Sequence, residues 1–572
     1  MKPAKISVAL ALFLLGIYLT EAKQWSEFLQ RKESAEVKND LESFRGLEAI
    51  YDIPDINRAQ TKILSSSPSK CCGSSRRSNE TGLNMEKDLN EMVTITKNEY
   101  NFLKYLRKLY AWLIYFPNHF NVREALLEAG FTDVQSEGFC KCCDSEHPTK
   151  PEQFHLALTS NPGEVIISYS TLINPEPYGQ CVTIEDETDG LGDTFTGRVF
   201  CTNDTRTFTI GSGQPPLICR NYSGYFHHVK VTGLVPGKKY YYSANAYSKR
   251  YSFIAPYGSN TSHVRFGAIA DIGTQGGKLT RAALRKHKDE MDFLMVIGDQ
   301  SYSNGCEAVF DKYMRDMEDI IAEVPYMIAA GNHEGPWNFT GIRNRFRMPL
   351  EESGAGPEAL WYSFDQGPVH FVVLSFEDYL NYEKGELYEE TYAEPLYIFQ
   401  DQVQWLEKDL EAFAKRRESN PNLWLIVMAH RPIRCSVNVS DCTELAPQLS
   451  ASLMPYLVKY KADLYTCGHV HTYERMDPTI PETGQLCSQC KPVNNVYYSP
   501  PYPVQVMNGY GGTVIEGHNI YTGPKPDWSA VRYNSSYYPY GGYAIVDVTN
   551  DRLNYTFYHT SGQVWDTFVI QK

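Results

Sequence analysis

Side chains able to bind metal ions follow five short apolar runs in the second half of the sequence. The runs read VRFGAIAD, DFLMVIGD, VPYMIAAGNH, NLWLIVMAH and ADLYTCGHVH. Carboxylate, amide, imidazole and phenolate groups are hard to borderline ligands, suited to Fe(III), Zn, Mn or Fe(II). The candidate ligands are Asp271, Asp299, Tyr302, Asn332, His430, His469 and His471.

Each of these residues, taken alone, has an ordinary structural explanation. An aspartate after a strand is usually a helix cap, and Asn-His is usually a turn. That explanation fails for the set, because it needs a coincidence at five consecutive strand ends. The set is larger than one ion needs and suits two ions bridged by a carboxylate, which together clamp the oxygens of a transferring phosphoryl group.

The phenol of Tyr302 narrows the choice of metal. Tyrosine ionises at about pH 10, so a strong Lewis acid is needed to keep it deprotonated as a ligand in acid. Fe(III) is such an ion, and the sequence therefore favours a ferric ion beside Tyr302.

The apolar runs predict strands that are buried on both faces of a sheet. Helical stretches such as KLTRAALRKHK and QDQVQWLEKDLEAFAKR lie between them, and this alternation is typical of α/β folds. Ligands gather at the carboxyl ends of such strands. Residues two apart in an extended chain point the same way, so His469 and His471 are expected to face one cavity.

Residues 149–260 predict a separate all-β domain. EVIISYSTL, HHVKVTGLVPGKKYYYSANAY and RYSFIAP are rich in strand-forming residues and are divided by Gly/Pro turns. VTGLVPGKKYYY resembles the strand–turn–strand of fibronectin type III modules, and a β-sandwich of about 100 residues fits. We expect the pair His227-His228 to be structural.

Residues 1–22 have the layout of a secretory signal peptide. Lys2 and Lys5 precede an apolar run that ends in Thr20-Glu21-Ala22; the alternative is an uncleaved membrane anchor. The expected location is extracellular, or vacuolar or lysosomal by the secretory route. Residues 23–148 contain NEYNFLKYLRKLYAWLIYF and NVREALLEAGF, which predict a helical, cysteine-containing extension of open purpose.

Fourteen cysteines fit an oxidising compartment. We expect most of them to form disulfides, with Cys435–Cys442 the favoured local pair. Cys487 and Cys490 lack a second ligand pair at zinc spacing. The candidate N-glycosylation sites are Asn79, Asn203, Asn221, Asn260, Asn338, Asn438, Asn534 and Asn554.

Length and charge limit the number of domains and the kinds of partner. A chain of 572 residues predicts about three or four domains. The formal net charge of −14 argues against a general affinity for nucleic acid or anionic membranes. No second apolar stretch is long enough for a membrane span, and the oligomeric state stays open.

The ordered motifs ADIG, GDQSY, GNHE, VMAH and GHVHTYER resemble the five-motif signature of the purple acid phosphatases, in the metallophosphoesterase superfamily. The resemblance extends from about Pro151 to the end of the chain. It implies an α/β fold, a sandwich of buried mixed sheets flanked by helices over residues 261–572, preceded by the fibronectin type III-like domain that long-form members carry.

The resemblance also implies roles for individual residues. Asp299 would bridge the two ions, and a metal-bound hydroxide would attack the phosphorus in line. Asn332 and His333 would bind the phosphate, and His333 would also stabilise the leaving oxygen. Fe(III) would be bound by Asp271, Tyr302 and His471, and the divalent ion (Zn, Mn or Fe(II)) by Asn332, His430 and His469.

One segment departs from the family pattern. Plant long-form members carry further histidines after the fourth motif, whereas this chain reads HRPIRCSVNVSDCTEL. Arg431 and Arg434 are the polar candidates there, and a guanidinium grips phosphate but is a poor proton donor. His518 is a further candidate from a later loop.

Three functions follow from these observations. The leading hypothesis is an acid phosphatase that hydrolyses phosphate monoesters of small molecules. The first alternative is a phosphodiesterase or nucleotide pyrophosphatase on the same metal site, because such leaving groups need less protonation. The second is a non-catalytic secreted binding protein, against which the retention of all the ligand positions argues.

Overall fold

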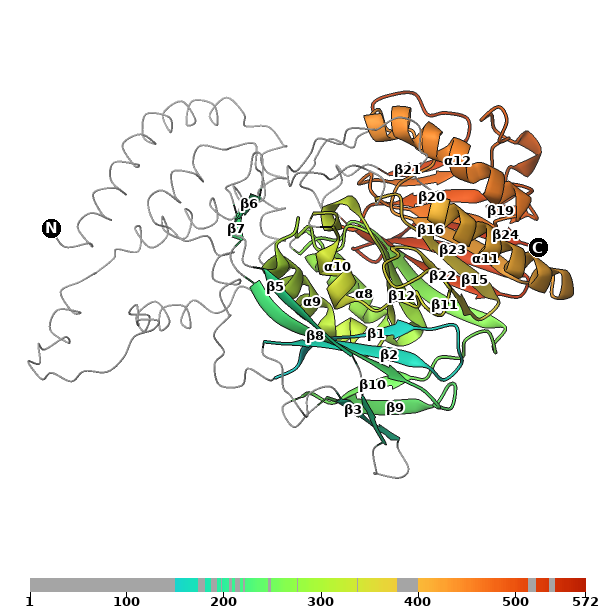
Figure 1. Ribbon diagram of the computed structural model, residues 1–572. Helices are drawn as coiled ribbons and strands as arrows, with labels where there is room; N and C mark the ends of the chain where they lie inside the picture. Colours follow the sequence, from blue (N-terminus) through green and yellow to red (C-terminus); the bar gives the residue numbers. More distant parts are fainter. Residues whose placement is uncertain are drawn as a thin grey trace, which may run out of the picture. The chain divides into compact units, whose positions relative to one another are not determined.

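The computed structural model describes residues 150–572 with gaps (Figure 1). The expected signal peptide (1–22) and helical extension (23–148) lie outside the described residues. All the described residues belong to one compact unit. The gaps of three or more residues are 173–180, 187–192, 205–207, 211–216, 245–247, 378–399, 513–520 and 534–540.

Two four-stranded antiparallel sheets form the first part of the described chain, with strand orders β1-β2-β8-β5 and β10-β9-β3-β4. Apolar side chains from both sheets, such as Ile167 and Tyr242, share one core, which confirms the predicted all-β region. The strands are β1 (Glu152–Leu158), β2 (Val165–Thr171), β3 (Cys181–Asp186), β4 (Asp193–Thr196), β5 (Arg198–Asp204), β8 (Tyr222–Val231), β9 (Lys239–Ser243) and β10 (Tyr251–Ile254), beside a small pair β6 (Phe208–Ile210) and β7 (Leu217–Cys219).

His227 and His228 are structural, as expected. Both are buried in β8. The Nε2 atom of His227 lies 2.8 Å from Thr171 Oγ1. The Nδ1 atom of His228 lies 2.8 Å from Ser168 Oγ, and its Nε2 lies 3.0 Å from the carbonyl oxygen of Asn344.

Two seven-stranded mixed sheets form the second part. We call them the first sheet, ordered β13-β12-β11-β22-β23-β24-β19, and the second sheet, ordered β14-β15-β16-β17-β20-β18-β21. The first contains β11 (His263–Ile269), β12 (Phe293–Ile297), β13 (Tyr326–Ala329), β19 (Val496–Tyr498), β22 (Gly542–Thr549), β23 (Arg552–His559) and β24 (Val564–Gln571). The second contains β14 (Tyr362–Gln366), β15 (Val369–Leu374), β16 (Trp424–Ala429), β17 (Leu464–Cys467), β18 (Tyr473–Met476), β20 (Val504–Asn508) and β21 (Ser529–Tyr533).

The five apolar runs of the sequence are strands of these sheets. β11, β12 and β13 are parallel neighbours in the first sheet, and β16 and β17 are parallel neighbours in the second. The predicted alternation with helices is confirmed, and the division of these strands between two mixed sheets agrees with the sandwich of mixed sheets that the resemblance implies. The α-helices are α8 (Lys278–Lys286), α9 (Glu307–Ile321), α10 (Thr340–Arg345), α11 (Gln400–Ser419) and α12 (Ala446–Lys459), with short turns η1 (Lys288–Glu290), η2 (Asn332–Glu334), η5 (Asp441–Leu445) and η6 (Ser488–Cys490).

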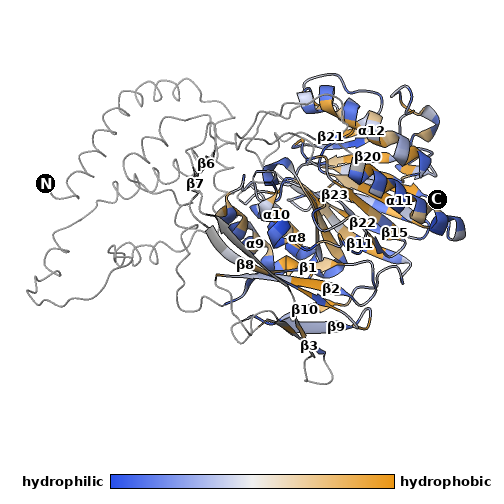
Figure 2. Ribbon diagram, viewed as in Figure 1, coloured by the Kyte–Doolittle hydropathy of each residue, from blue (hydrophilic) through white to orange (hydrophobic). Residues whose placement is uncertain are grey.

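Strand β16 shows why the runs are continuously apolar. Ile426 and Met428 point into the core between the two large sheets, whereas Leu425 and Val427 point into the core beneath α11 and α12. Each such side chain contributes about 1.5–3 kcal/mol on burial, so neither face tolerates polar residues. Figure 2 shows the apolar strands of the large sheets and the hydrophilic residues gathered on the helices.

A buried ion-pair network joins the first part of the chain to the second. The guanidinium of Arg345, only 1% exposed, lies 2.8 Å from Glu307 Oε2 and 2.6 Å from Asp311 Oδ1 on α9. It also donates to Gln153 Oε1 of β1 at 2.9 Å.

None of the described helices combines the length and apolar character needed to cross a bilayer.

Two local disulfides close loops near the second sheet. Cys435–Cys442 confirms the predicted pair, and Cys487–Cys490 forms as a second. Cys306 is also disulfide-bonded, and Cys467 is the free cysteine of the described chain.

A buried histidine ties the second sheet to α11. His370 Nδ1 lies 2.8 Å from Asp365 Oδ1, and its Nε2 lies 2.8 Å from Asp409 Oδ2. Burial alone would lower the pKa of His370, but the two carboxylates outweigh it and raise that pKa to about 9. The pKa of Asp365 is held below its usual range, because the His370 and Arg416 charges outweigh its burial.

The stability that this network contributes therefore decreases at high pH, through His370, and at low pH, through Asp365. The His370 contribution is complete below its unfolded pKa of about 6.5 and is lost as pH rises towards 9, whereas that of Asp365 is lost below about pH 4. We expect His370→Gln to lower the free energy of unfolding by about 3 kcal/mol more at pH 5.5 than at pH 9.5, measured by urea unfolding. An equal loss at both pH values would contradict this. His263→Gln is the control, because that half-exposed ring pairs with Asp547 at the surface.

Candidate metal centre

Side chains from five strand ends meet where the carboxyl edges of the two large sheets come together. Asp271 follows β11, Asp299 and Tyr302 follow β12, and Asn332 follows β13. His430 follows β16, and His469 and His471 follow β17. Parallel neighbours end at the same edge, so the topology alone brings these positions close. The contacts below connect all the ligand positions predicted from the sequence.

Asp271, Tyr302 and His471 form the first group. The Tyr302 hydroxyl donates to Asp271 Oδ1 at 3.0 Å and lies 2.7 Å from His471 Nε2. His471 Nε2 and Asp271 Oδ1 are 3.4 Å apart. All of these side chains are buried. A carboxylate, a phenol and an imidazole thus converge on one point.

Asn332, His430 and His469 form the second group. Asn332 Oδ1 lies 3.1 Å from His430 Nε2 and 3.0 Å from His469 Nδ1. His430 Nδ1 donates to the carbonyl oxygen of Ile297 at 2.8 Å, which leaves Nε2 as the ring atom that faces the group. Asn332 and His469 are half-buried. The other five candidate ligands are buried, so these two are the ones nearest to solvent.

Asp299 connects the two groups. Its carboxylate shares one possible metal position with His430 and His469, and another with Asp271 and His471, each with ligand atoms within 4.8 Å of one another. Asp299 Oδ2 is buried, lies 3.3 Å from His430 Nε2, and accepts no hydrogen bond of good geometry from the described residues. A buried carboxylate oxygen with spare acceptor capacity fits a bridging metal ligand.

The backbone at these ligands is strained. Positive φ angles occur at Asp271 (59°), Asp299 (49°), Tyr302 (54°) and His469 (69°). Non-glycine residues in this region cost on the order of 1–3 kcal/mol each and persist where the surroundings hold them, commonly at functional sites. Gly331 permits the close approach, because a Cβ atom there would collide with Asp299 Oδ1.

Buried charges at the centre shift one another's pKa values. Burial alone would raise the pKa of Asp299, but the charges of His430 and His333 outweigh it and hold that pKa well below its usual range. Burial alone would lower the pKa of His430, but Asp299 outweighs it and raises that pKa to about 10. A metal ion must therefore displace a proton from His430 before it can bind there.

Glu334 supports the ligand loops and was not identified from the sequence. Its carboxylate accepts hydrogen bonds from the backbone N–H groups of Asp299, Gln300 and Gly331 at 2.9–3.0 Å. Burial and the charge of Asp299 raise the pKa of Glu334 to about 8. Its place in the GNHE motif, directly after His333, was the available signal.

His333 lies beside Asp299 and the ring of Tyr302. Its backbone N–H donates to Asp299 Oδ1 at 3.0 Å, and its Nε2 lies 3.8 Å from Asp299 Oδ2. The other ring nitrogen, Nδ1, lies 2.6 Å from Asn304 Oδ1. Because an amide oxygen only accepts, Nδ1 carries the proton and Nε2 faces the centre.

The two arginines after His430 both have partners within the protein. Arg431 is fully buried and forms an ion pair with Glu377, at 2.9 Å from Nε to Oε1. Arg434 contacts the carbonyl oxygen of Gly484 and the ring of Trp528, and makes no contact with the candidate ligands among the described residues. A substrate role for Arg434 stays a prediction, and His518 lies outside the described residues.

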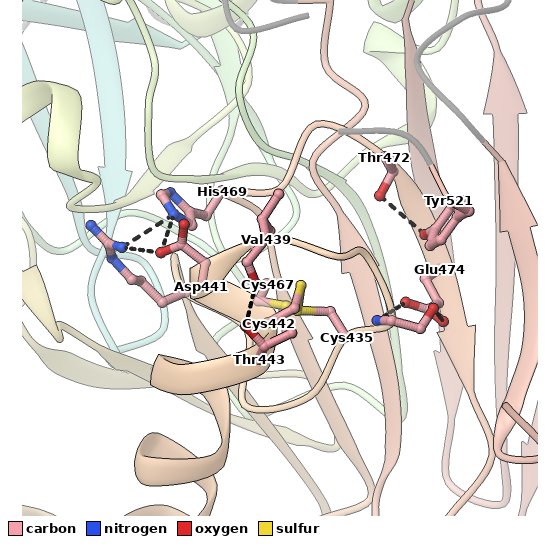
Figure 3. Close-up of a disulfide and its surroundings, with 12 residues drawn as sticks. Cys435, Val439, Asp441, Cys442, Thr443, Cys467, His469, Thr472, Glu474 and Tyr521 are labelled. Carbon is pink, nitrogen blue, oxygen red and sulfur yellow. Dashed lines mark hydrogen bonds and ion pairs between the residues drawn. A yellow bond between two sulfur atoms is a disulfide. The ribbon is translucent and has the colours of Figure 1, made fainter. Parts of the chain in front are cut away.

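A further carboxylate, Asp441, contacts the ligand His469 and was not identified from the sequence. Asp441 Oδ1 lies 3.0 Å from His469 Nε2 and 2.8 Å from Arg431 Nη1. Figure 3 shows Asp441 beside His469, next to the Cys435–Cys442 disulfide. The sequence carried no signal for this contact, because it depends on two distant loops meeting.

Family models match both folded parts of the chain. "Calcineurin-like phosphoesterase" matches residues 264–473, and "Purple acid Phosphatase, N-terminal domain" matches residues 151–258. The chain is 29% identical over 430 residues to acid phosphatase type 7 of Homo sapiens, covering 73% of this chain and 90% of that one. It is 30% identical over 346 residues to purple acid phosphatase 1 of Ipomoea batatas, covering 57% of this chain and 66% of that one.

The fold also has a solved counterpart. The structure of purple acid phosphatase PPD1 from yellow lupin (Lupinus luteus) seeds matches with a TM-score of 0.58 at 22% identity, covering 74% of each chain. At that identity the match speaks for the fold alone.

Proposed function

We propose that the chain hydrolyses phosphate monoesters at a dinuclear centre. The premise is that it belongs to the purple acid phosphatases of the metallophosphoesterase superfamily and is a metal-dependent acid phosphatase. The observation that carries the proposal is the arrangement of two ligand groups around one carboxylate, Asp299. Such a pair of ions polarises the phosphoryl oxygens and lowers the pKa of water, so that a nucleophile is available in acid.

The two groups suggest different ions. The first combines Asp271, Tyr302 and His471, and a phenolate ligand favours Fe(III). The second combines Asn332, His430 and His469, whose amide and imidazole groups suit Zn, Mn or Fe(II). Asp299 would bridge the two.

His333 is proposed to serve the phosphate and the leaving group. Because its Nδ1 proton is committed to Asn304 Oδ1, the neutral ring offers only a lone pair at Nε2. The protonated ring offers a second N–H there. His333 Nε2 therefore donates to the leaving oxygen only when the ring is protonated, which accords with work in acid.

The surroundings support a secreted or vacuolar or lysosomal enzyme. Three candidate glycosylation sites, Asn260, Asn338 and Asn438, are exposed, and the local disulfides suit an oxidising compartment.

We propose that residues 1–22 are a signal peptide, that 23–148 are a helical extension, that 149–260 are a fibronectin type III-like domain, and that 261–572 are catalytic. Of the other glycosylation candidates, Asn554 is half-buried, Asn79, Asn221 and Asn534 lie outside the described residues, and the side chain of Asn203 is not described.

The experiment compares the hydrolysis of an aryl phosphomonoester and an aryl phosphodiester at acid pH by the purified, metal-loaded protein. We expect kcat/KM to favour the monoester at least about tenfold, which is ~1.4 kcal/mol of transition-state stabilisation. The Asp299→Asn variant is the blank.

A diester preference would instead support a phosphodiesterase or nucleotide pyrophosphatase. The observation in its favour is the segment from Arg431 to Leu445, which has no histidine and whose Arg431 is committed to Glu377. Absence of both activities in protein with two bound ions would leave the non-catalytic alternative.

A further inference from the structure

The ring of His469 is held between the centre and a buried arginine–carboxylate cluster. Its Nδ1 lies 3.0 Å from Asn332 Oδ1, on the side of the second group. Its Nε2 lies 3.0 Å from Asp441 Oδ1 and 3.1 Å from Arg431 Nη1. Nδ1 is therefore the nitrogen available to a metal ion, and Nε2 is the one that its neighbours control.

These two neighbours require opposite protonation states of Nε2. A guanidinium can only donate, so a hydrogen bond from Arg431 needs a lone pair at Nε2. The neutral ring would then carry its proton on Nδ1, where it blocks metal binding. A carboxylate can only accept, so a hydrogen bond to Asp441 places the proton on Nε2 and leaves the Nδ1 lone pair free.

Arg431 cannot move away to resolve this conflict. Its Nε and Nη2 atoms lie 2.9 and 3.2 Å from the two carboxylate oxygens of Glu377, and both side chains are fully buried. Nη1 therefore stays beside His469. Asp441 Oδ1 lies 2.8 Å from that Nη1 and offers it a better acceptor than the ring.

Asp441 is itself fixed in position. It immediately precedes Cys442, whose disulfide to Cys435 closes the loop after β16, and it begins the turn Asp441–Leu445 that leads into α12. Figure 3 shows the carboxylate beside the imidazole of His469, with the disulfide to the right of them. A carboxylate placed this firmly can hold one tautomer.

The other imidazole of the second group does not depend on such a residue. His430 Nδ1 donates to the carbonyl oxygen of Ile297 at 2.8 Å, a backbone acceptor that no substitution removes. The tautomer of His430 is thus set by the fold, whereas that of His469 is set by the side chain at position 441.

We propose that Asp441 is a positioning residue that holds His469 in the Nε2-protonated tautomer, against Arg431, and thereby sets the affinity of the second metal position. The inference rests on the proposed role of His469 as a ligand of the divalent ion. It concerns one of the two metal positions, so its consequence is selective.

The test measures zinc binding by the full-length protein after removal of its weakly bound metal, by calorimetric titration and metal analysis. We expect Asp441→Ala to weaken zinc binding at the second position by about 10- to 100-fold, the usual range for an outer partner of a ligand histidine. The tightly bound ion of the first position should stay. Asp441→Asn keeps an acceptor oxygen and should retain most of the affinity.

Thr443→Ala is the matched control, because it alters the same turn at an exposed residue that contacts Val439 and not His469. Zinc binding of wild-type strength in Asp441→Ala would overturn the inference. So would equal loss of both ions, or equal weakening by Asp441→Asn and Asp441→Ala with native circular dichroism. A wild-type protein that binds no second ion would overturn the proposed function itself.

Discussion

Replacement of Asp299 with asparagine is expected to abolish phosphate ester hydrolysis and to remove one bound metal ion per chain. Asp299 is the carboxylate common to both ligand groups, and a neutral amide bridges two cations poorly. Loss of an outer partner of a ligand costs about 10- to 100-fold in activity, so loss of the bridging ligand should exceed that range. Metal analysis and hydrolysis of an aryl phosphate, on the same preparation, measure both effects.

Asp292→Asn is the control for this variant. Asp292 immediately precedes β12, the strand that Asp299 follows. Its carboxylate accepts a hydrogen bond from the backbone N–H of Arg265 at 2.7 Å. It should retain both ions and its activity. An Asp299→Asn protein with two ions and more than about a tenth of wild-type activity would contradict the bridging assignment.

Replacement of Tyr302 with phenylalanine is expected to remove a visible absorption band from the purified protein. A phenolate bound to Fe(III) transfers charge to the metal, and the Tyr302 hydroxyl lies 3.0 Å from Asp271 Oδ1 and 2.7 Å from His471 Nε2, where the first ion would sit. Phenylalanine fills the same space without the oxygen. Visible spectra at equal iron content measure the effect.

Tyr242→Phe is the matched control, because its buried hydroxyl donates to the Ala322 carbonyl in another part of the chain. The band should persist in this variant. A colourless wild-type protein with a full complement of iron would refute the ferric assignment, and so would a band that survives in Tyr302→Phe.

The strands and ligand positions were predictable because their signals are local. Each run, such as FLMVI, is largely apolar on both faces and is followed by a polar residue able to bind a metal, and parallel strands place such ends together. The five motifs added an order that resembles one family. The resemblance implied more than one sheet, but the sheet to which each strand belongs was not predictable, since pairing depends on contacts between distant segments.

The surroundings of the ligands were less accessible to sequence reasoning. Arg431 follows a ligand directly and was taken as a candidate for phosphate, yet it pairs with Glu377, 54 residues earlier. A buried arginine needs such a partner, but the sequence does not say which acid supplies it. Helix α9 was also missed, although Tyr313, Met317 and Ile320 recur at helical spacing on its buried face.

Both candidate metal positions take ligands from both large sheets. Tyr302 comes from the end of β12 in the first sheet and His471 from the end of β17 in the second, and Asn332 and His430 are divided in the same way. Bound ions would then act as cross-links between two halves of the folded chain. By mass action they add to its stability, by about 4 kcal/mol at a thousandfold excess over Kd. The lifetime of the enzyme, and not only its turnover, would follow the metal supply of its compartment.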